Sequence, residues 1–270
     1  LEKQAGLPFL DTASLVLFSQ TSKEHRKLCR LHCAWKKVEF RRKYGKFPML
    51  AAARLGDYKF VRSILKIDQE FVLDRDKHGR NALIWAAKKN QHKMIRTLLR
   101  WTALDILETD TDGNTPIHWA CTIGSLEALC CLVDPAENQM TGRAPMDRAM
   151  LVLQNSDGST PLHLAAAGGF LECVKFLLRE LKTKYQIPHL FPEWRAGTRI
   201  FYNVSLVDVR NNNGDTPLMR AAQLNHLPVV QFLLGMGATT SARNLQGQTP
   251  VYWAGLKHYW NIVTMLSEHA

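Results

Sequence analysis

The sequence predicts an all-α solenoid of about six helix-turn-helix repeats with short hairpin-like turns, preceded by N-terminal helices. A six-residue phrase recurs along the chain, and three of the five intervals between its copies are 33 or 34 residues long. An Ala-rich segment follows each copy, and then a second segment with apolar residues at helical spacing. Since no single helix pair could bury its apolar face alone, the pairs must stack. The copies read YGKFPM, HGRNAL, DGNTPI, DGSTPL, NGDTPL and QGQTPV, starting at Tyr44, His78, Asp112, Asp157, Asn213 and Gln246.

The recurring phrase has the chemistry of a tight turn that leads into a helix. Gly stands at its second position in every copy, where it provides a positive φ or steric room. In four copies a Thr is placed to cap the following helix, and Pro suits the first turn because its missing N–H would be unpaired anyway. Phe47 and Asn81 take the place of Thr in the first two copies. The predicted caps are Thr115, Thr160, Thr216 and Thr249.

At the level of whole repeats, the segment DGSTPLHLAAAGGFLECVKFLL at Asp157–Leu178 resembles the ankyrin repeat almost residue for residue. Asn213–Ala238 is close behind, and six units cover roughly residues 43–270. The resemblance implies a stack that binds proteins through its turn tips and the exposed residues of each first helix. It also implies that His118 and His163 hydrogen-bond to the neighbouring turn and have a structural role.

The chain divides into two parts of different composition. Residues 1–42 form a predicted helical extension that is basic from Lys23 onward, and residues 43–270 form the ankyrin-repeat domain. Insertions interrupt the repeats at about 134–153 and 182–210. Residues 23–46 hold ten Lys or Arg against two Glu, so +8 of the total charge of +11 lies in this short stretch. One end of the solenoid should therefore carry a positive field.

Composition limits the classes of protein that fit. With 46% hydrophobic and 22% charged residues the chain is globular, and its apolar runs are far shorter than the ~18 residues of a membrane span. Six Cys at irregular positions indicate an intracellular, reducing compartment, with the cytoplasm favoured and an organelle interior as the alternative. The chain opens with Leu1 and its last repeat has no polar outer helix. We therefore expect a processed or partial chain, or else a partner that covers the last repeat.

Motifs for catalysis or cofactor binding do not occur: there is no Gly-rich phosphate loop, nucleophile elbow or paired-His zinc motif. We predict a non-enzyme with no cofactor, no metal and no small-molecule substrate. His25, Cys29, His32 and Cys33 lie along one helical stretch, but a closed zinc site normally draws on two elements. Trp85, Trp119 and Trp253 share one position in their units, and packing between helices is the favoured interpretation.

Candidate binding residues follow from the positions that the ankyrin resemblance marks as exposed. In the first two units they are almost uniformly basic, and in later units nearly neutral. The basic set is Lys43, Lys46, Arg54, Lys77, His78, Arg80, Lys88 and Lys89. Asn114 and Thr122 follow in the third unit, and Trp194, Arg195 and Arg199 lie in the longer insertion.

Three functional hypotheses fit these features. The leading one is a non-catalytic scaffold or adaptor, a subunit of a larger assembly, whose basic N-terminal half binds an acidic protein surface. The alternative is a structural subunit of a ribonucleoprotein that contacts RNA phosphates, which predicts a steep loss of affinity with salt. A second alternative is the soluble ankyrin region of a larger membrane protein. Fold alone does not decide among them, because binding residues vary freely on a repeat scaffold.

Overall fold

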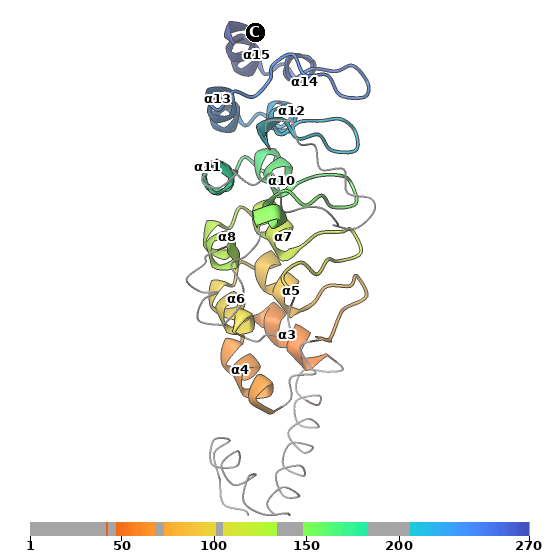
Figure 1. Cartoon of the computed structure of the whole chain (residues 1–270), viewed down its shortest axis with the longest axis vertical. Helices are drawn as coiled ribbons and strands as arrows, with labels where there is room; N and C mark the ends of the chain where they lie inside the picture. The colour runs from red at the N-terminus through yellow and green to blue at the C-terminus, as the bar shows by residue number, and fades with distance from the viewer. Residues whose placement is uncertain are drawn as a thin grey trace, which may run out of the picture.

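In a computed structural model, which describes residues 42, 47–67, 73–100, 105–133, 148–182 and 206–269, the chain is a stack of helix pairs (Figure 1). The first helices of the pairs form one column, and the second helices form another beside it. Hairpin-like loops project from the first column, and the described residues contain helices and turns but no strand. The all-α solenoid predicted from the sequence is confirmed.

Six helix pairs, here called repeats 1 to 6, follow the six phrases in order. Within each column every helix contacts the next one along the stack. The first helices are α3 (Pro48–Leu55), α5 (Ala82–Lys88), α7 (Pro116–Ile123), α10 (Pro161–Ala167), α12 (Pro217–Gln223) and α14 (Pro250–Leu256). The second helices are α4 (Tyr58–Ile67), α6 (His92–Leu99), α8 (Leu126–Val133), α11 (Leu171–Lys182), α13 (Leu227–Gly235) and α15 (Trp260–Glu268).

The predicted insertions are described only at their ends. Two short 3₁₀ helices lie there, η2 (Arg148–Leu151) before repeat 4 and η3 (Leu206–Asp208) before repeat 5. The remainder of both insertions, and the predicted N-terminal extension apart from residue 42, lie outside the described residues.

The recurring phrase starts each first helix as the sequence predicts. The side chains of Thr115, Thr216 and Thr249 accept a hydrogen bond from the backbone N–H three residues on, and Pro follows each of them. In repeat 2 the side chain of Asn81 makes the same bond to Ile84 at 2.8 Å, so Asn replaces Thr without loss of the cap. Two repeats differ: Phe47 provides no side-chain cap in repeat 1, and in repeat 4 the hydroxyl of Thr160 bonds instead to Nδ1 of His163 at 2.9 Å.

Close packing of the hairpins explains one glycine in particular. Gly158 has φ +71°, and a Cβ at this position would lie 2.6 Å from the backbone nitrogen of Asn212 in the next hairpin. Glycine therefore meets two demands at this turn, a left-handed backbone and a near contact with the neighbouring repeat.

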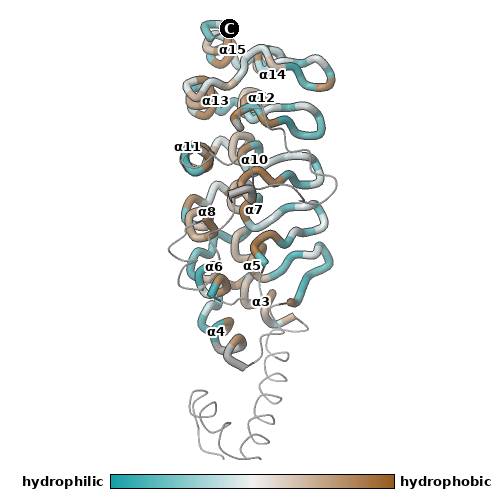
Figure 2. Tube along the Cα trace, in the orientation of Figure 1, coloured by the Kyte–Doolittle hydropathy of each residue, from teal (hydrophilic) through white to brown (hydrophobic). Residues whose placement is uncertain are grey.

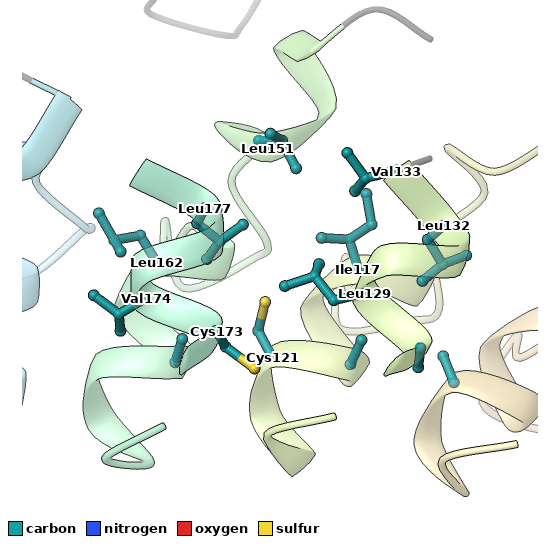
Figure 3. Close-up of a cluster of buried hydrophobic side chains, with 14 of the residues drawn as sticks. Ile117, Cys121, Leu129, Leu132, Val133, Leu151, Leu162, Cys173, Val174 and Leu177 are labelled. Carbon is teal, nitrogen blue, oxygen red and sulfur yellow. The ribbon is translucent and has the colours of Figure 1, made fainter. Parts of the chain in front are cut away.

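A continuous apolar core runs between the two columns. Figure 3 shows the part between repeats 3 and 4, where Ile117, Leu129 and Leu177 are fully buried. The side chains of Cys121 and Cys173 lie near each other in this core, and both are free thiols. Burial raises the pKa of Cys173 to about 11 and that of Cys121 well above its usual range, so both behave as small apolar core residues.

Hydropathy divides the stack into two surfaces. The hairpins are mostly hydrophilic, whereas apolar residues concentrate on the helices (Figure 2). Along the described part of the chain, every helix is too short or too polar to cross a bilayer. The polar hairpins and the adjoining ends of the first helices are therefore the surface to examine for a binding site, and we call this the hairpin-side surface.

Candidate functional site

A ladder of backbone hydrogen bonds holds the hairpin tips in register. The carbonyl of the tip residue in one hairpin accepts a bond from an N–H of the next hairpin at 2.9–3.0 Å, from repeat 2 to repeat 6. Equivalent side chains therefore form one row along the stack. The tip residues in this row are His78, Asp112, Asp157, Asn213 and Gln246.

One side chain organises each hairpin from within. Its Oδ1 atom accepts hydrogen bonds from the backbone N–H groups two and four residues further on, at 2.8–3.1 Å. The residue is Asp in repeats 2 and 3 and Asn in repeats 4 to 6. The five organisers are Asp76, Asp110, Asn155, Asn211 and Asn244.

The second polar atom of the organiser residue is Oδ2 in Asp and Nδ2 in Asn, so the residue type decides whether this atom accepts or donates a hydrogen bond. In repeats 2 and 3 the carboxylate Oδ2 accepts a bond from a tryptophan indole, Trp85 to Asp76 at 3.1 Å and Trp119 to Asp110 at 2.8 Å. An amide nitrogen cannot accept such a bond, and Asn244 instead donates from Nδ2 to Asp215 at 2.9 Å. The aspartates therefore fix two indole rings on the hairpin-side surface.

Three cations surround the ring of Trp85. The guanidinium carbons of Arg80 and Arg54 lie 4.5 Å and 4.9 Å from the ring centroid, and the Nζ atom of Lys88 lies 5.7 Å away. Lys88 also lies 3.7 Å from the ring centroid of Trp119, so it bridges repeats 2 and 3. These distances are those of cation–π contacts. We call Arg54, Arg80, Lys88, Trp85 and Trp119 the cation–tryptophan cluster.

Two cations of this cluster form no ion pair within the described chain. Arg80 pairs with Asp76 at 2.9 Å. Arg54 and Lys88 are held against indole rings but form no ion pair or side-chain hydrogen bond with any residue that the structure describes. Their N–H groups therefore remain available to an anion.

Titration behaviour agrees with a crowded positive environment. Burial lowers the pKa of Lys88, and the neighbouring charge of Arg80 lowers it further, against the opposing effect of Asp110 and Asp76. For Asp76 burial alone would raise the pKa, but backbone hydrogen bonds from Arg80 and His78 and the Arg80 side chain together lower it. Asp76 therefore stays ionised and holds Arg80 in place.

The remaining predicted residues of repeats 1 to 3 differ in their roles. Lys77, His78 and Lys89 are exposed, and Lys89 directly follows α5. Asn114 is partly used by the scaffold, because its Oδ1 accepts a bond from Asn155 at 2.9 Å. Thr122 is exposed, and its hydroxyl donates to the carbonyl of His118 at 2.8 Å. Lys43, Lys46, Trp194, Arg195 and Arg199 lie outside the described residues.

His118 and His163 join successive repeats, as the ankyrin resemblance implied. In each ring Nδ1 accepts from the backbone N–H of the preceding capping Thr, which leaves the proton on Nε2. Nε2 of His163 then donates to the carbonyl of Asp215 at 2.9 Å, and that of His118 to the carbonyl of Ser159 at 3.2 Å. Burial lowers the pKa of both rings to about 4, so both are neutral near pH 7.

The sequence favoured packing between helices as the role of the tryptophans, and this interpretation covers only part of what Trp85 does. Trp85 is indeed 9% exposed, but its ring also carries the cations described above. A sequence signal for this arrangement exists: an Asp stands nine residues before Trp85 and nine before Trp119. Before Trp253 the corresponding residue is Asn244, and no indole–carboxylate bond forms there within the described chain.

Charge changes abruptly where repeat 2 meets repeat 3. Residues 47–100 contain twelve Lys or Arg and five Asp or Glu, a net charge of +7. Residues 105–133 contain five Asp or Glu and no Lys or Arg, a net charge of −5. Since charges within about 10 Å interact at ordinary ionic strength, the two regions present opposite fields to a partner that lies across them.

A regular stack of capped helix pairs with a polar hairpin surface defines a repeat solenoid of the interaction type. The family model of ankyrin repeats matches this chain three times, over residues 17–107, 102–188 and 197–270. The chain belongs to the ankyrin-repeat family. Ankyrin repeats generally mediate protein–protein interaction and are typically non-catalytic.

One curated relative shares a short segment of similarity. Alpha-latrotoxin-Lg1a from Latrodectus geometricus is 35% identical over 52 residues, which is 19% of this chain. The aligned segment spans 4% of the toxin's length. Because the match covers so small a share of either chain, nothing about the toxin's activity is carried over to this protein.

Proposed function

We propose that this protein is a non-catalytic scaffold that holds an acidic segment of a partner protein on the hairpin-side surface of repeats 1 and 2. The observation that carries the proposal is the pair Arg54 and Lys88, two cations that lie against indole rings and form no ion pair with any described residue. Stacking restricts their motion, so less conformational entropy is lost when a carboxylate binds. Lys77 and Lys89, both exposed, extend the same positive surface.

An intracellular, reducing location is part of this proposal. Cys121 and Cys173 form a pair of free thiols buried in the core of repeats 3 and 4. Such pairs stay reduced where glutathione and thioredoxin act.

The test is a binding titration with a fluorescein-labelled oligoglutamate peptide, followed by anisotropy. Lys89→Glu is compared with Lys257→Glu, a matched control because both lysines are exposed and directly follow a first helix, α5 and α14. We expect Lys89→Glu to weaken binding by about fivefold or more, as charge reversal beside a carboxylate removes attraction and adds repulsion. Lys257→Glu should leave the affinity within about twofold.

The RNA alternative is tested in the same assay with a labelled single-stranded RNA. Several phosphate contacts would give a steep linear fall of log affinity with log salt. RNA binding that exceeds peptide binding, is steep in salt and is lost in Lys89→Glu would replace the acidic protein partner with RNA. Equal loss of peptide affinity in both variants would mean that the peptide senses only net charge, and would contradict the proposed surface.

A further inference from the structure

We infer that the partner segment carries two blocks of opposite charge, an acidic block on repeats 1 and 2 and a basic block on repeats 3 and 4. This inference rests on the proposed function and adds the order of charges along the partner. It follows from which charged side chains the scaffold already uses, and which it leaves available on each side of the charge boundary.

On the basic side, more cations lack an ion pair within the described chain than have one. Arg75 pairs with Glu108 at 2.6 Å, and Arg80 pairs with Asp76 at 2.9 Å. Arg54, Lys77, Lys88 and Lys89 form no ion pair with any residue of the described chain. An acidic block placed there meets four cations.

On the acidic side, the carboxylates inside the hairpins bond to other residues of the stack, whereas those at the hairpin tips do not bond to any described residue. Glu108 accepts from Arg75 and Asn81, and Asp110 is 6% exposed and bonded to Trp119 and its own hairpin. Asp112 and Asp157 are exposed, occupy adjacent tips, and have no partner for their carboxylates within the described residues. Their hairpins are joined by the bond from Ser156 N–H to the Asp112 carbonyl at 3.0 Å.

An acidic block cannot continue past repeat 2 without meeting these carboxylates. Repulsion between like charges on a partner costs affinity directly, whereas a basic residue at the same place gains it. Lys88 marks the boundary, since it contacts Trp85 of repeat 2 and Trp119 of repeat 3. The single change of field along the hairpin-side surface, from positive on repeats 1 and 2 to negative at the tips of repeats 3 and 4, therefore selects both the composition of the partner and the position of its charge change.

The experiment compares three labelled peptides by anisotropy. One is oligoglutamate, one joins a glutamate run to a lysine run, and one alternates the same glutamates and lysines. Both orders of the two-block peptide are used, so that chain direction does not decide the result. We expect the two-block peptide to bind about tenfold tighter than the alternating one, because each alternating charge meets a wrong partner as often as a right one.

The protein variants are Asp112→Lys with Asp157→Lys, and Asn213→Lys as the matched control at the tip of repeat 5. The parent protein should bind the two-block peptide more tightly than oligoglutamate. Charge reversal at the two aspartates should weaken binding of the two-block peptide about tenfold and tighten binding of oligoglutamate, so that this ranking is inverted. Asn213→Lys should preserve the ranking. Circular dichroism and thermal melting establish that each variant folds like the parent.

The outcomes separate the inference from the function on which it rests. If oligoglutamate binds at repeats 1 and 2, but the ranking of the peptides is the same in the parent and the aspartate variant, the two-block inference is wrong and the acidic partner stands. If no peptide binds the parent protein, the proposed function and the inference both fail. Inversion of the ranking in the aspartate variant alone supports the inference.

Discussion

Repeats 1 and 2 and repeats 5 and 6 share one scaffold but present different surfaces. At the end of the first helix, repeat 2 has Lys88 and Lys89, whereas repeat 6 has Leu256 and Lys257. Leu256 is 54% exposed where repeats 1 and 2 have Arg54 and Lys88, and Leu224 in repeat 5 is 45% exposed where repeat 2 has Lys89. The comparison teaches that capping and core positions fix the fold, while the adjoining exposed positions are free to choose a partner.

The largest effect should come from the core, and it should be equal in both regions. Leu98 and Leu233 occupy the same position in α6 and α13, and both are 0% exposed. Leu→Ala at either site should lower the free energy of unfolding by about 2–5 kcal/mol through lost burial and a residual cavity. Chemical denaturation measures the change, with Leu256→Ala as an exposed control.

A loss at Leu98 much larger than at Leu233, beyond that range, would break the claim of a common scaffold. An effect of Leu256→Ala as large as that of Leu233→Ala would show that repeat 6 has a covered apolar face.

The next largest effect is a pH dependence centred on the middle repeats. His118 and His163 have a pKa of about 4 in the fold, against an ordinary value of 6.5. The unfolded chain binds more protons between these values, so stability is full above pH 6.5 and falls as the pH drops toward 4. Each histidine contributes about 3 kcal/mol across this interval, at 1.36 kcal/mol per pKa unit.

Repeats 1 and 2 have Leu50 and Ile84 at the equivalent position, so acid should loosen the junctions of repeats 3 to 5 first. Hydrogen exchange followed by mass spectrometry at pH 7 and pH 5 locates the change. Uniform loss of protection along the whole stack would show that these two rings are not its cause.

A smaller effect separates the two kinds of tryptophan. Trp119→Phe removes the indole N–H that bonds to Asp110 and leaves a 6% exposed carboxylate with one partner fewer. The free energy of unfolding should fall by about 2 kcal/mol, as expected when a buried acceptor loses its donor. Trp253→Phe, where no such bond exists among the described residues, should cost less when both are measured by thermal melting. Equal costs would remove the distinction.

The smallest effect concerns the caps, which are part of the common scaffold. Thr216→Ala should cost about 1 kcal/mol, because the Met219 N–H loses the side-chain oxygen that accepts from it. Thr111→Ala is the control, since Thr111 is exposed on a hairpin and its side chain has no bond within the described chain. Urea denaturation of both variants resolves the difference, and a cost at Thr111 equal to that at Thr216 would contradict the assigned cap.

The sequence predicted the scaffold closely because its residues repeat. Gly158 and Thr216 stand at positions that recur with the period, and the bond of His163 to the next turn repeats that of His118; each has a local physical cause. The basic set of repeats 1 and 2 was also predicted, but how its members gather around Trp85 was not. That arrangement depends on an Asp nine residues earlier and on Arg54 from the preceding repeat, a relation that appears only when repeats are stacked.

The change of charge between repeats 2 and 3 was not predicted from the sequence, for a different reason. The candidate binding residues of the later repeats are nearly neutral, whereas residues 105–133 as a whole carry a net charge of −5. Which of its carboxylates are available depends on bonds such as that of Asp110 to Trp119, which form only in the folded stack.

The most direct test of an acidic partner at repeats 1 and 2 is fluorine NMR on protein labelled with fluorotryptophan. Trp85 and Trp119 lie in the cation–tryptophan cluster, while Trp253 and Trp260 lie in repeat 6, and single Trp→Phe variants assign their resonances. On addition of oligoglutamate the account predicts that the Trp85 and Trp119 resonances shift together and saturate with the affinity seen by anisotropy. Shifts of Trp253 and Trp260 with Trp85 and Trp119 unchanged would contradict it.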